Sequence, residues 1–286
     1  LGLSIICGTI VFLKLLKILS REGDLVIFLV ITMSVPLVIG ATKFSRRKIK
    51  LVHFESGLRA NTKRSILLDK LYKFGDQHAN YLFVPYKSCE RNLKKEKVKG
   101  KILYSGDVMF DVIKRTLKLK TSERIPTTKY VVANFTRSII TKRDAEEIIK
   151  TLSKLKKENL VFLNPVIENR FKQFNLFKEL QSLPKIKLRK SIPYVDFLHL
   201  IKNSDFVITD STGVEEECFV LGKSCVVTND FIQFPEIESF GLVKVAGCNS
   251  EKILSFINSK KEISKPHLKF KEGATKIIAD HLEKML

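Results

Sequence analysis

The sequence predicts an α/β protein with two Rossmann-like domains, each built on a parallel β-sheet that is covered by helices. The first observation is that apolar runs alternate with amphipathic helical patterns along a chain of 286 residues. The second is that this alternation occurs in two series, separated by a basic and polar stretch at 118–129. The third is a hydrophobic content of 44%, enough for a substantial core. Two such series predict two domains that face a central cleft.

In the first series, strands are expected where runs rich in β-branched and aromatic residues end at polar turns. These runs are 25–31, 50–54, 81–84 and 102–104. Helices are expected at 4–20, 35–44, 65–74, 88–97 and 108–117. A nucleotide-binding half-domain normally opens with a strand and a Gly-rich turn, which this sequence lacks. We therefore expect an incomplete N-terminal domain over 1–118, and the start at Leu1 instead of Met suggests a truncated chain.

The second series predicts a complete nucleotide-binding domain over 119–268. Its strands are expected at 130–133, 160–163, 185–189, 206–209, 224–227 and 242–245. Its helices are expected at 144–156, 168–180, 194–202, 214–221 and 251–258, with a last helix at 275–286.

The net charge of +21 indicates a polyanionic partner such as nucleic acid, an anionic membrane or a phosphorylated substrate. The basic residues are spread along the chain, and the densest run, at 94–101, has no interleaved aromatic residues. No RNP, zinc-finger or helix-turn-helix signature is present, so we do not expect a nucleic-acid partner. The apolar stretch 25–41 contains Pro36 and is slightly short for a membrane span, so we expect no stable membrane insertion.

The five cysteines show no CxxC spacing, and no metal-binding set can be built from cysteine and histidine. Most of the cysteines lie among apolar neighbours, which predicts buried free thiols in a reducing compartment. We therefore expect a cytoplasmic protein without a metal ion or other cofactor.

The segment 204–236 predicts a β-turn-α-β unit whose helix ends at Gly222. Thr212 and Glu215 have the spacing of a capping box, which predicts where the helix begins. The turn before the helix presents free backbone N–H groups and the positive end of the helix dipole, a combination that suits a phosphate. A carboxylate in the first two turns can accept both hydroxyls of a ribose. The alternative is that the three glutamates at 215–217 are only favourable charges at a helix N-terminus.

A second polar cluster follows the strand expected at 50–54 and reads His53-Phe-Glu55-Ser-Gly-Leu-Arg59. Open α/β sheets place ligands at the carboxyl ends of their strands, so we expect this cluster to lie at a site. His53 is either a site residue itself or a residue that orients Glu55.

The two clusters resemble motifs of the non-hydrolysing UDP-N-acetylglucosamine 2-epimerases, which are two-domain proteins of the GT-B type. Residues 209–217 resemble the family's T-D-S-G-G-[IV]-Q-E-E, and residues 53–59 fill every fixed position of its H-x-E-[AS]-G-[LI]-R. The resemblance covers nearly the whole chain. It implies that residues 269–286 form a closing helix that packs back on the N-terminal domain.

The resemblance also implies a reaction, in which C2 of a UDP-sugar is inverted by elimination and re-addition of UDP. Glu55 falls on the family's catalytic carboxylate, and His53 belongs to the same motif. Asp69 falls, by its spacing from Arg59, on a second catalytic carboxylate that the family provides as Glu. The shorter side chain moves that carboxylate back by one methylene group, which matters for proton transfer.

For the substrate, the resemblance implies that the turn amides hold the diphosphate and that Glu217 holds the ribose hydroxyls. Phe197 falls where the family stacks the uracil ring, although an aromatic residue at this helical spacing is equally expected in a core. The substrate-binding residues expected in this way are Ser211, Thr212, Gly213, Glu216, Glu217, Phe197 and Arg137.

The sequence departs from the family at positions that serve phosphate binding and proton transfer. The first strand should end in G-D-T, but Val30-Ile31-Thr32 stands there. A His-Arg pair is missing after the strand at 130–133, which leaves Arg137 as the nearby cation. Three hypotheses therefore stay open: an epimerase-like isomerase, a catalytically impaired sugar-nucleotide-binding protein, and a GT-B glycosyltransferase. Each takes a UDP-sugar as its partner, and each leaves a homodimer open.

Overall fold

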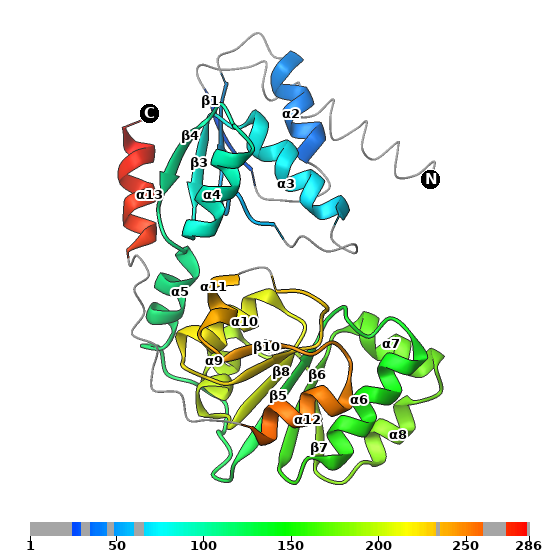
Figure 1. Cartoon of the computed structure of the whole chain (residues 1–286). Coiled ribbons are helices and arrows are strands. Elements are labelled where there is room, and N and C mark those ends of the chain that lie inside the picture. The colour runs from blue at the N-terminus through cyan, green and yellow to red at the C-terminus, as the bar shows by residue number, and fades with distance from the viewer. Residues whose placement is uncertain are drawn as a thin grey trace. The chain divides into compact units, whose positions relative to one another are not determined.

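The structure is a computed structural model that describes residues 25–29, 35–44, 49–59, 66–232, 235–259 and 273–284. The chain divides into two compact units (Figure 1). Unit 1 consists of residues 1–108 and 270–286, and unit 2 consists of residues 109–269. The division falls after residue 108, whereas the sequence-based boundary was placed after 118. The helix expected at 4–20 lies outside the described residues.

Unit 1 contains a four-stranded parallel sheet in the order β1-β2-β3-β4. Its strands are β1 (Leu25–Leu29), β2 (Ile49–His53), β3 (Tyr81–Val84) and β4 (Lys101–Tyr104). Its helices are α2 (Val35–Phe44), α3 (Ile66–His78), α4 (Lys87–Lys95) and α13 (Ala274–Glu283). Helix α5 (Val108–Thr116) begins at the last residue of this unit's first stretch and otherwise belongs to unit 2. Ile278 of α13 packs with Val52 of β2 and Phe83 of β3, so the returning helix covers this sheet.

Unit 2 contains a six-stranded parallel sheet in the order β10-β9-β8-β5-β6-β7. Its strands are β5 (Tyr130–Phe135), β6 (Glu158–Leu163), β7 (Ile186–Arg189), β8 (Phe206–Thr209), β9 (Cys225–Val227) and β10 (Val243–Val245). Its helices are α6 (Lys142–Lys154), α7 (Pro165–Gln173), α8 (Phe177–Ser182), α9 (Tyr194–Asn203), α10 (Thr212–Val220), α11 (Pro235–Ser239) and α12 (Ser250–Asn258). The strand order reverses between β5 and β8, which is where doubly wound sheets bind ligands.

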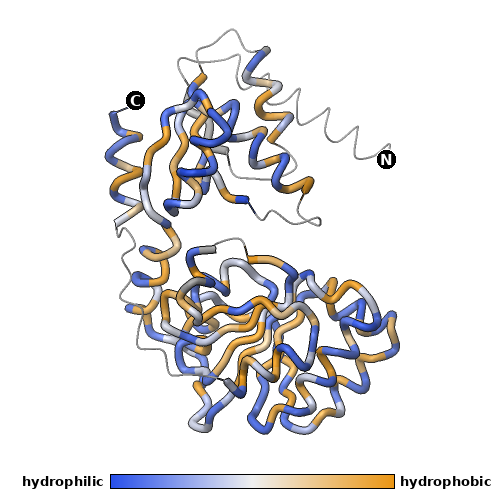
Figure 2. Tube along the Cα trace, viewed as in Figure 1, coloured by the Kyte–Doolittle hydropathy of each residue, from blue (hydrophilic) through white to orange (hydrophobic). Residues whose placement is uncertain are grey.

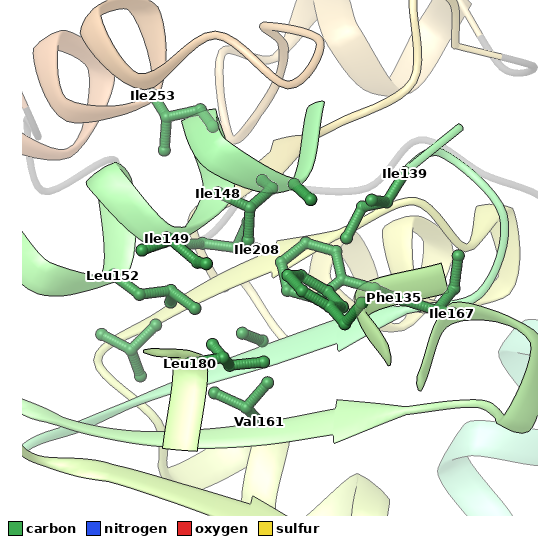
Figure 3. Packing of buried hydrophobic residues seen from close by; sticks show 14 of the residues in the cluster. Phe135, Ile139, Ile148, Ile149, Leu152, Val161, Ile167, Leu180, Ile208 and Ile253 are labelled. Atoms are coloured by element: carbon green, nitrogen blue, oxygen red, sulfur yellow. The ribbon is translucent and has the colours of Figure 1, made fainter. Parts of the chain in front are cut away.

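The core of unit 2 explains why its strands read as continuous apolar runs. Figure 2 shows hydrophobic residues along the middle strands of the sheet, as expected where helices cover both faces. On one face, Phe135 and Ile208 from the sheet pack against Ile148 of α6, Leu180 of α8 and Ile253 of α12 (Figure 3).

Two predicted details of unit 2 are wrong. The single helix expected at 168–180 is two helices, α7 and α8, because Asn175 adopts a left-handed conformation (φ 60°) that an α-helix cannot contain. Helix α7 also begins earlier than expected, at Pro165, where the Asn164 side chain accepts a hydrogen bond from the Ile167 amide at 2.9 Å. The short helix α11 was not predicted.

The remaining predicted strands and helices occur in the described part of the chain, with small differences at their ends. Cys89, Cys218 and Cys225 are buried there and Cys248 is half-buried, and none of the four forms a disulfide within the described residues. None of the described helices combines the length and the apolar character that a membrane crossing needs.

Candidate functional site

The polar loop of unit 1 spans residues 53–59 and begins at His53, the last residue of β2. The Ser56 amide donates to the Phe83 carbonyl at 3.0 Å, and the Asn92 side chain donates to the Gly57 carbonyl at 2.9 Å. Gly57 has a φ of 82°, and a Cβ atom there would lie 2.4 Å from the carbonyl oxygen of Cys89. Only glycine combines this conformation with so close an approach of two backbones.

A buried network of charges holds the 53–59 loop against α3 and α4. Asp76 of α3 is fully buried, and its Oδ2 accepts from the Gly57 amide at 3.2 Å and from Arg59 Nη2 at 2.7 Å. Arg59 also donates to both carboxylate oxygens of Glu96, at 3.0 and 2.6 Å. His53 Nδ1 lies 2.7 Å from Asp76 Oδ1. The loop is therefore held by carboxylates from α3 and from the end of α4.

The side chain of Glu55 is exposed. Its backbone adopts a left-handed conformation with a φ of 53°. It lines a small cavity of about 40 Å³ together with Asp107 and with Ile278 of α13. Partial desolvation raises the pKa of Glu55, repulsion from Asp107 adds to this effect, and the charge of His53 acts in the opposite direction. A raised pKa favours the protonated form of a carboxyl group and makes its carboxylate a stronger base, which suits proton transfer.

Asp69, the second predicted catalytic carboxylate, lies half-buried in the first turn of α3. Asp76, two turns further along the same helix, is the carboxylate that contacts His53. Asp76 and Glu96 lie outside both sequence motifs and were not predicted. The only signal that could have indicated them is the general need of a buried arginine for carboxylate partners.

In unit 2, the helix start after β8 differs from the prediction in one respect. Ser211 is the N-cap of α10 and makes no side-chain capping bond. The predicted capping box of Thr212 and Glu215 is wrong because Thr212 is already the first helical residue. Three positions after the N-cap stands Val214, which has no side-chain acceptor to complete such a box.

Asp210, between β8 and α10, organises this region instead. Its fully buried carboxylate accepts four hydrogen bonds from the loop after β5. The donors are the amides of Thr136 (2.7 Å), Arg137 (2.6 Å) and Ser138 (2.6 Å) and the hydroxyl of Thr136 (2.7 Å). This contact joins β5 to β8 at the point where the strand order reverses.

The start of α10 is sterically open. Ser211, Thr212 and Gly213 are half-buried. A Cβ atom at Gly213 would meet only Ser211 Oγ, at 4.0 Å. The first N–H groups of any α-helix have no acceptor within the helix, so these amides can bind an anion.

The three glutamates that follow are all buried, which distinguishes them from the solvated charges that usually flank a helix N-terminus. Desolvation raises the pKa of Glu217 to about 7, and a hydrogen bond with Tyr194 of α9 offsets part of this effect. Desolvation raises the pKa of Glu215 to about 8, with Arg137 lowering it and Asp210 raising it. Neither carboxyl oxygen of Glu215 has a hydrogen-bond partner within the described residues. Glu216 is also buried, and its charge helps to raise the pKa of Tyr194.

A cavity of about 500 Å³ lies at the carboxyl ends of β5, β6 and β7. Phe197 of α9 lines this cavity and also packs edge-on against Phe162, with ring centroids 5.2 Å apart. The structure thus gives Phe197 both a packing contact and a place at a cavity. Tyr194 lies one turn before Phe197 on α9, so this helix connects the cavity to Glu217.

Arg137 is exposed, and its charge acts on Glu215. Arg189, which lines the cavity, pairs with Glu123 at 2.6 Å. Asp196 holds the segment before β5 by accepting from the Thr121 hydroxyl at 2.6 Å and from the Ser122 amide at 2.8 Å. These hydrogen bonds lower the pKa of Asp196 to about 2. The described residues contain no group of three or more His, Cys, Asp or Glu side chains that could hold a metal ion.

Comparison with known proteins gives one consistent result. A family model described as UDP-N-acetylglucosamine 2-epimerase matches residues 13–279. A UDP-N-acetylglucosamine 2-epimerase homolog of Methanococcus maripaludis is 27% identical over 272 residues, which cover 91% of this chain and 75% of the relative. The UDP-N-acetylglucosamine 2-epimerase of Methanocaldococcus jannaschii is 28% identical over 255 residues, which cover 82% of this chain and 69% of the relative.

Solved structures agree with the predicted fold class. The M. jannaschii epimerase in complex with UDP-GlcNAc and UDP has a TM-score of 0.82 at 24% identity, covering 96% of this chain and 80% of that one. The Neisseria meningitidis epimerase bound to UDP-GlcNAc has a TM-score of 0.77 at 21% identity, covering 97% and 81%. The prediction of an α/β protein of the GT-B type with parallel sheets is therefore confirmed.

Proposed function

The chain belongs to the UDP-N-acetylglucosamine 2-epimerase family, and we propose that it is an isomerase that inverts C2 of a UDP-sugar. One observation carries the proposal: the two family motifs form two polar loops, each at the carboxyl end of a parallel sheet. In unit 1 the loop carries Glu55 above a paired charge network. In unit 2 the open start of α10 stands beside the buried Glu217. Relatives of this fold have been solved with UDP-GlcNAc bound.

In this proposal, unit 2 binds the nucleotide. The diphosphate binds at the start of α10, where Ser211, Thr212 and Gly213 provide the hydroxyl and the amides. The ribose hydroxyls donate to Glu217, which Tyr194 holds in place. The uracil ring enters the cavity beside Phe197, because a volume of about 500 Å³ accommodates a base. Phe197 and Tyr194 both belong to α9, so this helix fixes the distance between the positions of the base and the ribose.

The diphosphate also needs positive charge. Arg137 is the exposed cation that lies near the start of α10, on the loop that Asp210 holds. Glu216 and Glu217 are negative neighbours, so Arg137 must offset their repulsion as well as the charge of the leaving group.

Unit 1 supplies the proton transfers. A carboxylate removes the proton at C2 while the bond between C1 and the UDP oxygen breaks, which leaves a glycal and UDP. A proton that has exchanged with solvent is then added to the opposite face of C2, and the UDP oxygen re-forms its bond to C1. We assign Glu55 to this work, with His53 as the charge beside it and Asp69 as the second carboxylate.

The test is incubation with UDP-GlcNAc in deuterated water, followed by NMR of the recovered nucleotide sugar. We expect deuterium at C2 and formation of the C2 epimer. Binding of UDP-GlcNAc without exchange would instead identify a sugar-nucleotide-binding protein. Transfer of the sugar to an acceptor without C2 exchange would identify a glycosyltransferase.

A matched pair of variants assigns the chemistry to Glu55. Glu55→Gln is expected to slow C2 exchange by about 10²–10⁴-fold, the usual contribution of a general acid or base. UDP affinity should stay unchanged because Glu55 lies in unit 1. Glu90→Gln on α4, which removes a surface carboxylate paired with Lys87 and Lys94, is the control and should keep full activity.

The proposal includes a location in the cytoplasm. A homodimer stays a prediction. Light scattering coupled to size-exclusion chromatography measures the assembly directly.

A further inference from the structure

The contact between His53 and Asp76 defines a proton position. His53 Nδ1 and Asp76 Oδ1 lie 2.7 Å apart, and both side chains are fully buried. The two atoms are not aligned as a hydrogen bond, since neither has a hydrogen-bond partner among the described residues. Two lone pairs would nevertheless repel each other at this distance, which is shorter than an ordinary contact between nitrogen and oxygen. The neutral ring of His53 is therefore expected to carry its proton on Nδ1.

The other oxygen of Asp76 is already committed. Oδ2 accepts from the Gly57 amide at 3.2 Å and from Arg59 Nη2 at 2.7 Å. Both partners can only donate hydrogen bonds. The carboxylate thus cannot rotate to offer a different group to His53 without leaving the backbone of the 53–59 loop and a buried guanidinium unpaired.

The rest of the His53 ring has little freedom. Its Nε2 has no hydrogen-bond partner among the described residues. Tyr72 of α3 stacks on the ring, with centroids 6.4 Å apart. The charged groups near this end of the loop include Asp76 beside His53, Arg59, which pairs with Asp76, and Asp107, which lines the cavity with Glu55. His53 is therefore oriented by α3 and placed two residues before Glu55.

We propose that Asp76 is a positioning residue, which fixes the nitrogen of His53 that carries the proton and thereby the positive charge that His53 can place beside Glu55. No role in the site follows for Asp76 from the sequence motifs, because it lies outside both. The kinetic consequence of this inference rests on the proposed function, whereas the proton position does not.

The structure predicts what Asp76→Asn would do. The amide oxygen must take the Oδ2 position, because Gly57 and Arg59 donate there. The amide NH₂ group then faces His53 Nδ1, which becomes an acceptor. The neutral ring shifts its proton to Nε2, and the ring can no longer be protonated at Nδ1 without two donors facing each other.

The wild-type protein gives the first test. We expect ¹⁵N NMR of histidine-labelled protein at high pH to show a protonated Nδ1 and an unprotonated Nε2 for His53. An Nε2–H tautomer, or two averaging tautomers, would overturn the proposal. This measurement needs no variant, so it remains decisive if Asp76→Asn does not fold.

The variant gives the second test. In Asp76→Asn we expect the His53 tautomer to invert and the pKa of Glu55, followed by carboxyl ¹³C NMR, to rise because the charge of His53 is lost. We expect kcat to fall by about 10²-fold with KM changed by less than about threefold, since the nucleotide site lies in unit 2. An unchanged tautomer or an unchanged Glu55 titration would contradict the proposal.

Glu96→Gln is the matched control. It removes a carboxylate from the same arginine but leaves the contact between Asp76 and His53 in place. We expect the His53 tautomer, the Glu55 titration and kcat to stay as in the wild type. If Glu96→Gln reproduced the effects of Asp76→Asn, the network would be merely structural, and the assignment to Asp76 would be wrong.

The two proposals can fail separately. A wild-type protein with the expected tautomer but no C2 exchange would refute the epimerase function and leave the Asp76 inference standing. A protein that exchanges C2 but has the Nε2–H tautomer would do the reverse.

Discussion

In unit 1, the buried carboxylate of Asp76 has Arg59, His53 and the Gly57 amide as partners. In unit 2, the buried carboxyl group of Glu215 has no hydrogen-bond partner among the described residues. The buried carboxyl group of Glu217 has a hydrogen bond with Tyr194. The difference separates two ways of building a site. The 53–59 loop is already organised before a ligand arrives, whereas the glutamates after β8 keep raised pKa values that a ligand hydroxyl or cation can change.

The largest effect on stability is expected at Gly57, where the 53–59 loop lies closest to a neighbouring backbone. Gly57→Ala places a methyl group 2.4 Å from the Cys89 carbonyl and forces an L-residue into a left-handed conformation. We expect a loss of roughly 3 kcal/mol or more in the free energy of unfolding, measured by chemical denaturation. Gly247→Ala is the control, because Gly247 has a φ of 65° but no atom within 4 Å of the added Cβ. It should cost about 1 kcal/mol, and equal costs would show that the contact with Cys89 is unimportant.

The second effect concerns Asp210, a buried carboxylate of unit 2 whose two oxygens both accept hydrogen bonds. Asp210→Asn turns an NH₂ group towards the donors of the loop after β5, so we expect a loss of roughly 3 kcal/mol. UDP affinity, measured by calorimetry, should also fall because that loop carries Arg137. Asp144→Asn, which disturbs the capping box of α6, should cost only about 1 kcal/mol. A wild-type affinity in Asp210→Asn would argue against a role for the loop in binding.

Replacing a glutamate with glutamine should change the free energy of unfolding in opposite directions in the two units. Burial raises the pKa of Glu215 to about 8 from an ordinary value of 4.5. The contribution of this group to the stability of the folded protein is therefore fully present below pH 4.5. That contribution is lost as the pH rises through 8. Glu215→Gln should therefore stabilise the protein by roughly 2 kcal/mol at pH 9 and have little effect near pH 4.

Glu96→Gln should destabilise the protein by about 1 kcal/mol at neutral and high pH, because it weakens two hydrogen bonds from Arg59. Denaturation curves of both variants across this pH range measure the two effects. Destabilisation by Glu215→Gln at pH 9 would show that Glu215 has a partner in the folded protein.

The smallest effect is expected for Tyr194→Phe. The hydrogen bond with Tyr194 lowers the pKa of Glu217, so its loss should raise that pKa above about 7. If ionised Glu217 accepts the ribose hydroxyls, UDP affinity should increase with pH, and the midpoint should move up by about half a unit in the variant. Calorimetric titrations with UDP measure this shift. Tyr81→Phe in unit 1 should leave the profile unchanged, and a midpoint common to all three proteins would exclude Glu217 as the titrating group.

The sequence predicts the sheets better than the contacts between their loops. Strands of a parallel sheet are apolar on both faces, so β6 and β8 could be recognised as continuous apolar runs. The break at Asn175 could not, because a single left-handed residue leaves the helical pattern on either side intact. The motifs also place Glu55 in the loop after β2 and Glu217 in the helix after β8.

What the sequence does not indicate is pairing across elements. Asp76 and Glu96 lie in different parts of the chain from Arg59, and nothing in their spacing shows that they share it. The capping prediction failed for a local reason, since a shift of the N-cap by one residue replaces Glu215 with Val214 at the position that matters. The raised pKa values of Glu215 and Glu217 depend on burial, which only the fold supplies.

Unit 1 is assembled from two stretches, 1–108 and 270–286, and Ile278 of the second packs on Val52 and Phe83 of the first. A ribosome therefore synthesises all of unit 2 before it releases α13. Until then the nascent β-sheet of unit 1 has an uncovered apolar face, which is the kind of surface that chaperones bind. Unit 2, encoded without interruption, can finish folding while unit 1 still waits for its last helix.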